Sequence, residues 1–194
     1  MKRILAISVA IACLTGVAAR AQDDDADGAQ DDEFGRSGWY LGGYGVYAFE
    51  AYRSTGILDF DDSFGANFRI GYRGNEWVAL EGEIEWIRDF ESDYLGKVKT
   101  RTLIGGVNAK LFPLSGRFQP YGLVGINGMY VTMKDSPPGY DDSVTDWAFR
   151  FGLGLDIYAT RNVVLGLEGS YVWGVGDVWE RDYASAGVGI LFRF

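Results

Sequence analysis

Three regularly spaced glutamates, Glu81, Glu83 and Glu85, are side chains that could carry out acid–base chemistry. A pair of carboxylates can act as proton donor and acceptor, or as acid and nucleophile, in glycoside hydrolysis. A spacing of two residues, however, places all three side by side on one face of a β-strand. No substrate pocket is indicated between them, so we interpret them as part of a charged surface.

Basic side chains share this face on the neighbouring segments. By residue parity, five basic and six acidic positions face the same way: Arg69, Arg73, Arg150, Arg193 and Lys110 with Glu81, Glu83, Glu85, Glu168, Asp146 and Asp156. Charges in a narrow, water-poor space are costly unless they are paired. The pattern predicts an interlocking salt-bridge network, and a small ion-conducting pore is the alternative interpretation.

Composition excludes several classes of protein. The 194 residues include no histidine, so a Ser-His-Asp triad, a His-ligated zinc site or a histidine general base cannot be built. With 18 basic and 27 acidic residues, the net charge of -9 disfavours nucleic acid as a partner. No cofactor and no metal site are predicted.

Residues 1–21 have the features of a secretory signal peptide. A basic start is followed by an apolar run that is too short to span a bilayer, and Ala19 and Ala21 occupy the positions that signal peptidase reads. The single cysteine, Cys13, lies in this segment, so the mature chain is expected to form no disulfide and to have no reactive thiol.

Residues 22–35 are predicted to be an acidic, disordered segment. Its Asp and Glu residues are accompanied by almost no apolar side chains that could be buried to offset the entropy of ordering. A calcium site is the alternative, but the ligand and glycine spacing of an EF-hand loop is absent. All further structure is therefore expected in one domain, residues 36–194.

Within this domain, apolar residues alternate with period 2 and show no helical repeat. The clearest segment begins at Trp147 and ends at Ile157, with a large apolar residue at every second position. The alternation predicts eight strands, at residues 38–49, 63–73, 78–86, 99–112, 119–133, 146–157, 163–174 and 184–194. The segment 119–133 is apolar on both parities, so its facing is left open.

Connections between the predicted strands alternate in length. Short turns are expected at 73–76, 113–117 and 159–162, and longer polar connections at 50–62, 88–96, 134–144 and 176–182. Short turns on one rim and long loops on the other are typical of an up-and-down antiparallel barrel that crosses an outer membrane. The predicted fold class is therefore all-β, an eight-stranded antiparallel transmembrane β-barrel.

The apolar face is predicted to point outward. An eight-stranded barrel has room only for a filled interior, and its glycine-rich face leaves space there for a few long polar side chains. Aromatic residues are expected in two interfacial girdles, Trp39, Tyr72, Phe192 and Phe194 near the short turns and Tyr47, Phe49, Phe64, Trp86, Trp147 and Trp173 near the long loops.

Three motifs carry a family resemblance: Gly38–Gly45 (GWYLGGYG), Pro120–Gly122 (PYG) and Gly189–Phe194 (GILFRF). Together they resemble the small eight-stranded outer-membrane barrels of the OmpA, OmpX and opacity-protein type. The resemblance implies outer-membrane lipid as surroundings, and recognition of Gly189, Phe192 and Phe194 by the barrel-assembly machinery. Lipid-modifying and protease barrels use a catalytic histidine, which this sequence lacks.

The sequence therefore predicts an integral outer-membrane protein with a structural or surface-interaction, adhesion-like role and a plugged lumen. A narrow, weakly cation-selective pore is the main alternative, and a lipid-modifying enzyme is less favoured. An extracellular ligand would bind at the four long connections.

Overall fold

The computed structural model describes residues 34–50, 63–92, 98–134, 143–178 and 182–194. Eight strands account for nearly all of them: β1 (Gly38–Glu50), β2 (Ser63–Arg73), β3 (Val78–Ser92), β4 (Val98–Leu111), β5 (Phe118–Lys134), β6 (Ser143–Tyr158), β7 (Val163–Gly174) and β8 (Tyr183–Arg193). One short 3-10 helix, η1 (Gly176–Val178), precedes β8. The predicted signal peptide and nearly all of the acidic segment 22–35 lie outside the described residues.

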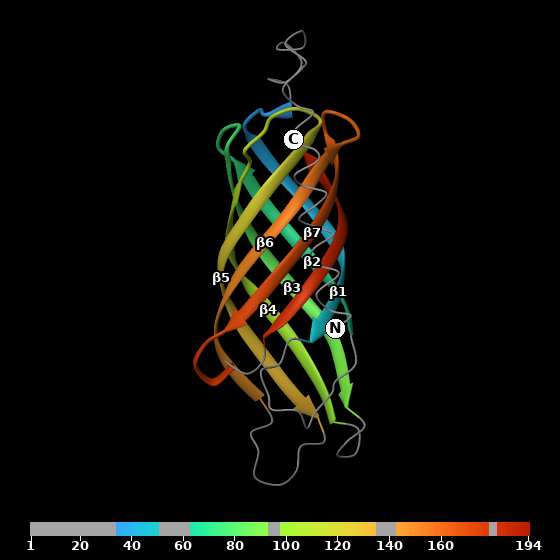
Figure 1. Ribbon diagram of the computed structural model, residues 1–194, viewed down its shortest axis with the longest axis vertical. Helices are drawn as coiled ribbons and strands as arrows, with labels where there is room; N and C mark the ends of the chain where they lie inside the picture. The colour runs from blue at the N-terminus through green and yellow to red at the C-terminus, as the bar shows by residue number, and fades with distance from the viewer. Residues whose placement is uncertain (1–33, 51–62, 93–97, 135–142, 179–181) are drawn as a thin grey trace, which may run out of the picture.

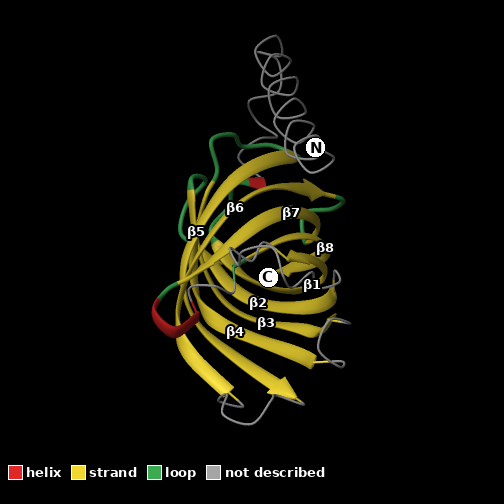
Figure 2. Cartoon of the chain, turned by 60° about the horizontal axis from the view of Figure 1, so that its bottom comes forward, coloured by secondary structure: helices red, strands yellow, loops and turns green. Residues whose placement is uncertain are grey.

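Each strand pairs antiparallel with the next, and β1 also pairs with β8, so the sheet closes on itself. Figure 1 shows the strands tilted around a common axis, and Figure 2 shows the closed wall from an oblique direction. The predicted up-and-down antiparallel barrel is confirmed. No helix in the described ranges is long and apolar enough to cross a membrane.

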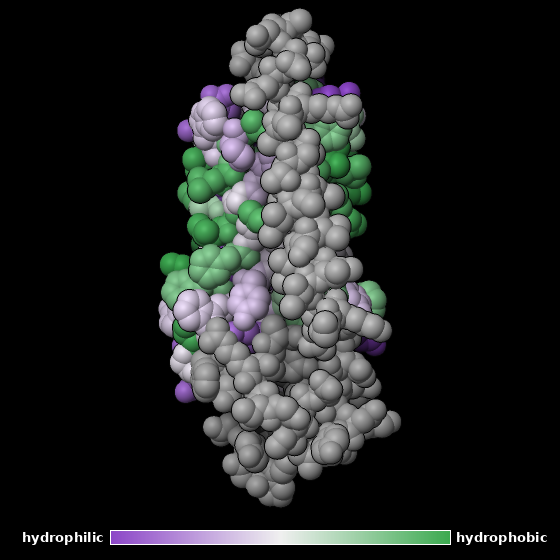
Figure 3. Space-filling view, viewed as in Figure 1, coloured by the Kyte–Doolittle hydropathy of each residue, from purple (hydrophilic) through white to green (hydrophobic). Residues whose placement is uncertain are grey.

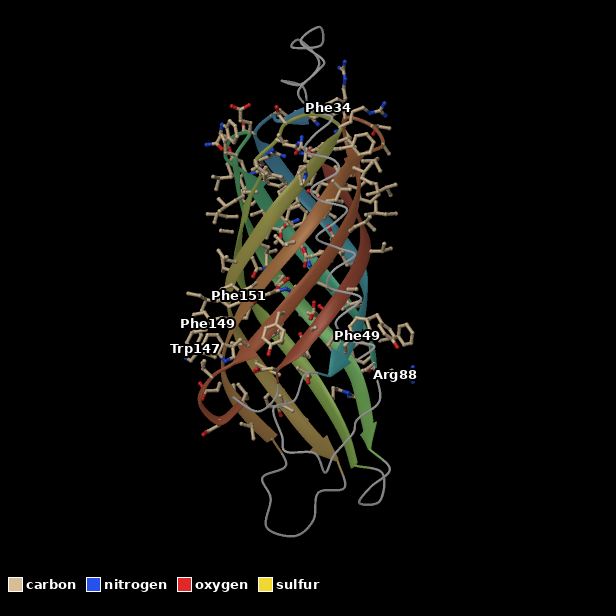
Figure 4. All side chains as sticks on the ribbon, viewed as in Figure 1. Phe34, Phe49, Arg88, Trp147, Phe149 and Phe151 are labelled. Carbon is tan, nitrogen blue, oxygen red and sulfur yellow. The ribbon has the colours of Figure 1, made fainter. Side chains whose placement is uncertain are left out.

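The short turns and the C-terminus share one rim of the barrel. Phe34 lies at this rim (Figure 4), and the backbone N–H of Phe194 donates to the carbonyl of Trp39 there at 3.0 Å. The opposite rim carries the longer connections. One of these is shorter than predicted, because β3 continues to Ser92 and takes up half of the expected loop 88–96.

Large apolar side chains cover the outside of the wall. All the aromatic residues predicted for the two girdles are exposed except Tyr47, which is half-buried against the rings of Phe49 and Phe64. On the face that Figure 3 shows, hydrophobic residues lie at the middle height of the barrel and hydrophilic ones toward both ends. An apolar band of this kind is stable in lipid, and the predicted outward facing is confirmed.

The structure also settles the facing of β5, which has apolar residues of both parities. Val124 and Ile126 point outward into the apolar band, whereas Leu123, Met129 and Val131 are buried inside the barrel. Met129 and Val131 are apolar because the lumen itself becomes apolar toward the long-connection rim, whereas Leu123 lies lower, beside Lys110 of β4.

Candidate functional site

The lumen is the candidate functional site, because it gathers buried charged side chains from six of the eight strands. Alternation along each strand directs every second residue inward. At mid-height, Arg69 of β2, Arg150 of β6 and Lys110 of β4 face carboxylates of β3 and β7, and all of them are less than a tenth exposed.

Arg69 and Glu168 form the shortest ion pair of this cluster. The two guanidinium NH₂ groups of Arg69 donate to the two oxygens of Glu168 at 2.5 and 2.7 Å, a fork-to-fork geometry. Tyr121 donates to Glu168 Oε2 at 2.8 Å, and Arg150 approaches Oε1 at 3.3 Å. Four donor groups thus hold Glu168 as a carboxylate.

Arg150 bridges two of the regularly spaced glutamates. One of its NH₂ groups lies 2.9 Å from Glu83 Oε1 and 2.9 Å from Glu85 Oε2. The amide of Asn67 donates to the same two glutamates, at 3.0 and 2.8 Å, and Tyr183 donates to Glu85 at 2.5 Å. Glu83 and Glu85 therefore serve as acceptors for fixed donors, which is a structural arrangement rather than that of a free acid–base pair.

Glu81 and Lys110 form the part of the cluster nearer the short turns. Lys110 Nζ lies 2.9 Å from Glu81 Oε1 and 4.1 Å from the ring centre of Tyr121, and Tyr40 donates to the same glutamate oxygen at 2.9 Å. Asp156 is buried in this region, and its Oδ1 has no hydrogen-bond partner among the described atoms. The mid-height cluster holds three cationic side chains and five carboxyl groups.

Two arginines of the predicted network lie elsewhere. Arg73 and Arg193 are buried at the short-turn rim, where within the described ranges they bind neutral groups and no carboxylate. Arg73 donates to Gln119 Oε1 at 2.5 Å and to backbone carbonyls of its own turn. Arg193 donates to the Phe34 carbonyl at 2.7 Å and to the Tyr158 hydroxyl at 2.5 Å. The two side chains close the lumen at this end.

Asp146 is the one predicted network residue that lies outside the lumen. It has the correct parity on β6, but its position is beyond the closed part of the wall, at the long-connection rim. Its carboxylate accepts the backbone N–H groups of Trp147 and Asp177, at 2.7 and 2.9 Å, and so fixes the start of η1. Parity gives the face of a residue, whereas its height along the strand decides whether that face is enclosed.

An apolar layer, which we call the seal, closes the lumen toward the long-connection rim. It consists of buried side chains from six strands and from η1: Val46, Ala48, Ile87, Ile104, Met129, Val131, Ala148, Val172 and Val178. The seal lies between the charged cluster and the solvent at the long-connection rim. Sequence analysis missed it, although the double apolar parity of 121–133 was its signal.

Buried tyrosines were also missed. Tyr40, Tyr44 and Tyr121 point into the lumen, where a Cβ on Gly71, Gly166 or Gly154 would lie within 2.3 Å of their ring or hydroxyl atoms. The space that the inward glycines leave is therefore filled by tyrosine rings. The signal was available in the sequence, because Tyr40 and Tyr44 lie on the opposite parity to the outward Trp39 and Leu41.

The barrel resembles several solved outer-membrane proteins. Neisserial surface protein A has a TM-score of 0.65 at 16% identity, covering 81% of this chain and 98% of that chain. The N-terminal β-barrel domain of Pseudomonas aeruginosa OprF has a TM-score of 0.57 at 16% identity, covering 82% and 100%. Ail, the attachment invasion locus protein of Yersinia pestis, has a TM-score of 0.53 at 18% identity, covering 82% and 99%. These identities show a shared fold.

Comparison with curated proteins finds no match. A family model described as the outer membrane protein beta-barrel domain matches residues 9–194, nearly the whole chain. The chain therefore belongs to the outer membrane protein β-barrel family.

Proposed function

We propose that the protein is a closed, non-conducting barrel in the outer membrane of a Gram-negative cell, the location that its family membership implies. A structural or surface-interaction role would be carried by its long-connection rim. The observation that supports this proposal is the filled lumen, with a paired charge cluster at mid-height between the apolar seal and the Arg73–Arg193 end. Water and ions find no continuous polar path through such an interior.

The first prediction concerns conductance. In planar bilayers, the purified, refolded protein should give no steady single-channel current, because an ion would have to cross the seal without its hydration shell. A wide-pore porin measured in the same bilayers provides the positive control. Large, steady currents through the unmodified protein would contradict the proposal.

A narrow cation-selective pore is the second candidate function. The observation that favours it is the excess of carboxyl groups over cationic side chains in the mid-height cluster. If this candidate is correct, currents should be carried by cations, and replacing Asp156 by asparagine should reduce the preference for cations over anions. Reversal-potential measurements in a salt gradient distinguish it from the closed barrel.

For the surface role, the sequence of the long connections suggests the chemistry of the partner. Residues 51–62 and 135–142 contain more acidic than basic residues, together with Tyr52, Phe60 and Tyr140. Ail was crystallised with a heparin analogue, sucrose octasulfate, but an acidic rim would repel such a polyanion. We therefore propose that the partner is positively charged, such as a basic peptide segment, and that it contacts the aromatic side chains of these connections.

A binding experiment tests this surface role. Barrels in nanodiscs should bind immobilised basic peptides, and binding should fall when residues 51–62 and 135–142 are replaced by Gly-Ser linkers of equal length. Immobilised heparin, which is negatively charged where the peptides are positively charged, serves as the control surface. Preference for heparin, or equal peptide binding after loop replacement, would contradict the proposal.

The second prediction concerns assembly. We propose that Gly189, Phe192 and Phe194 form the signal read by the barrel-assembly machinery, and that residues 1–21 direct export. Phe194→Asp should leave most of the protein outside the membrane, measured by fractionation and heat-modifiable gel migration. Phe118→Asp is the matched control, because Phe118 also belongs to the short-turn rim and is similarly exposed, at 58% against 67%. Equal losses would show that both residues act only as girdle side chains.

A further inference from the structure

The short-turn rim of the barrel carries an excess of positive charge. From Phe34 onward, the turns and strand ends that form this rim contain one acidic residue, Glu76, and five arginines. Within the described ranges, four of the five guanidinium groups meet only neutral oxygen atoms. We call these four the arginine rim: Arg36, Arg73, Arg117 and Arg193.

Two members of the arginine rim are buried, which makes the missing negative charge costly. Arg73 and Arg193 both donate to the hydroxyl of Tyr158, at 3.3 and 2.5 Å, and their other acceptors are an amide oxygen and backbone carbonyls. Asp156 lies one inward position deeper on β6 than Tyr158 and forms no ion pair with either arginine. Neutral acceptors complete the hydrogen bonds of a guanidinium group but leave its charge uncompensated.

The other two members are exposed at the edge of the same rim. Arg117 reaches the carbonyls of Tyr158 and Ala159 only at 3.4 and 3.5 Å. Arg36 donates to the carbonyl of Arg161 at 3.2 Å. A guanidinium group carries several N–H donors in a planar fork that fits a carboxylate. Arg36 and Arg117 therefore keep donors for an anion that approaches this end of the barrel.

A highly acidic segment of the same chain leads directly to this rim. Residues 22–33 contain seven acidic and no basic side chains. The next residue, Phe34, is fixed at the rim (Figure 4): its ring centre lies 5.1 Å from that of Tyr158, and its carbonyl accepts an N–H of Arg193 at 2.7 Å. The acidic residues are therefore joined to the barrel beside a buried arginine of the rim.

We propose that residues 22–33 dock in cis on the arginine rim, where their carboxylates supply the missing negative charge and cover this end of the barrel against other polyanions. Twelve extended residues span up to about 40 Å, whereas the far side of an eight-stranded wall is four strand spacings away, about 20 Å. Tethering gives the segment an effective concentration of about 1 mM or more, which favours it over free anions. The docking does not depend on whether the lumen conducts.

Paramagnetic NMR of the refolded chain, residues 22–194, in phosphatidylcholine nanodiscs measures this contact. A nitroxide label on Ala29→Cys, the only cysteine of that chain, should broaden the amide signals of residues 115–117 at low salt. A neutral variant, with Asn and Gln replacing the acidic residues of 22–33, should lose most of this broadening. So should the acidic segment at about 1 M salt, where the Debye length is only about 3 Å. Equal broadening in the neutral variant would show proximity by tethering alone and overturn the proposal.

Substitutions at the two rims locate the contact. Arg36→Gln/Arg117→Gln removes the exposed members of the arginine rim and should reduce the broadening. Arg88→Gln is the matched control, because it removes an exposed arginine of the opposite rim and should leave the broadening unchanged. Heat-modifiable gel migration verifies that each variant is folded. Equal broadening in both variants would also contradict the docking.

Fluorescent poly-L-glutamate, added to the same nanodiscs, tests whether the segment covers the rim. The neutral variant should bind this probe at least about tenfold more tightly than the wild type, because tethered carboxylates no longer compete. Adding Arg36→Gln/Arg117→Gln to the neutral variant should abolish the gain. Equal binding by the wild type and the neutral variant would mean that the rim is open to anions in trans or binds none, and either result would overturn the proposal.

Discussion

Replacing Arg150 by alanine is expected to lower the free energy of unfolding by about 3 to 5 kcal/mol, the usual cost of removing one partner from a buried ion pair. The guanidinium of Arg150 contacts three carboxylates, Glu83, Glu85 and Glu168, and all four side chains are buried. Without it, Glu85 would keep only the neutral donors Asn67 and Tyr183. Glu83 would keep Asn67 and the more distant guanidinium of Arg69, at 3.7 Å. The loss should appear as a lower midpoint of urea unfolding in phospholipid vesicles, followed by tryptophan fluorescence.

Two further variants identify the cause of this loss. Arg88→Ala removes an arginine at the outer rim and should change stability by less than about 0.5 kcal/mol, as surface substitutions do. Arg150→Met combined with Glu83→Gln removes charge of both signs while keeping volume, and should recover part of the stability lost in Arg150→Ala. If Arg88→Ala were as damaging as Arg150→Ala, or if the double variant recovered nothing, the interpretation as a buried ion network would be wrong.

The fold was predictable because the two faces of a barrel wall lie in different surroundings, the lumen and the outside. Successive residues of a strand face them in turn, so the sequence alternates with a period of two. The segment 63–73 matches β2 in both bounds, and the alternation from Trp147 to Ile157 matches the inward and outward facing of β6. Predicted bounds were less accurate near the long-connection rim, where β3 continues past Trp86 to Ser92. The register shift between Ile87 and Phe90 interrupts the alternation there, so a period of two no longer marks the strand.

The partners inside the lumen were not predictable to the same extent. Arg69 and Glu168 are 99 residues apart, and they meet only because the register of the closed sheet sets both at the same height. The same register places Arg73, Arg193 and Asp146 at the ends of the barrel, away from the oppositely charged side chains that they were expected to meet. A single sequence specifies the face of each residue but leaves the relative height of distant strands undetermined.

The second large loss of stability is predicted for a substitution on the outward face of the barrel wall. Phe151→Arg is expected to cost about 2 to 4 kcal/mol of unfolding free energy if Phe151 lies near the bilayer midplane. Phe151 is 46% exposed between the two girdles, and its neighbours across the strands are Val124 and Tyr171. An arginine there would have to reach a distant headgroup or draw water into the apolar band. Urea unfolding in vesicles of fixed composition measures the cost.

Thr145→Arg is the matched control, because Thr145 is exposed on the same face of β6 but beyond Trp147, at the water-facing side of the girdle. The same substitution should cost only about 0 to 1 kcal/mol there, since the depth of an arginine in the bilayer determines its penalty. Phe151→Leu keeps the position apolar and should resemble wild type. Equal costs for arginine at residues 145 and 151 would contradict the membrane depth deduced from the girdles, whereas a steep difference would map the edge of the apolar band onto β6.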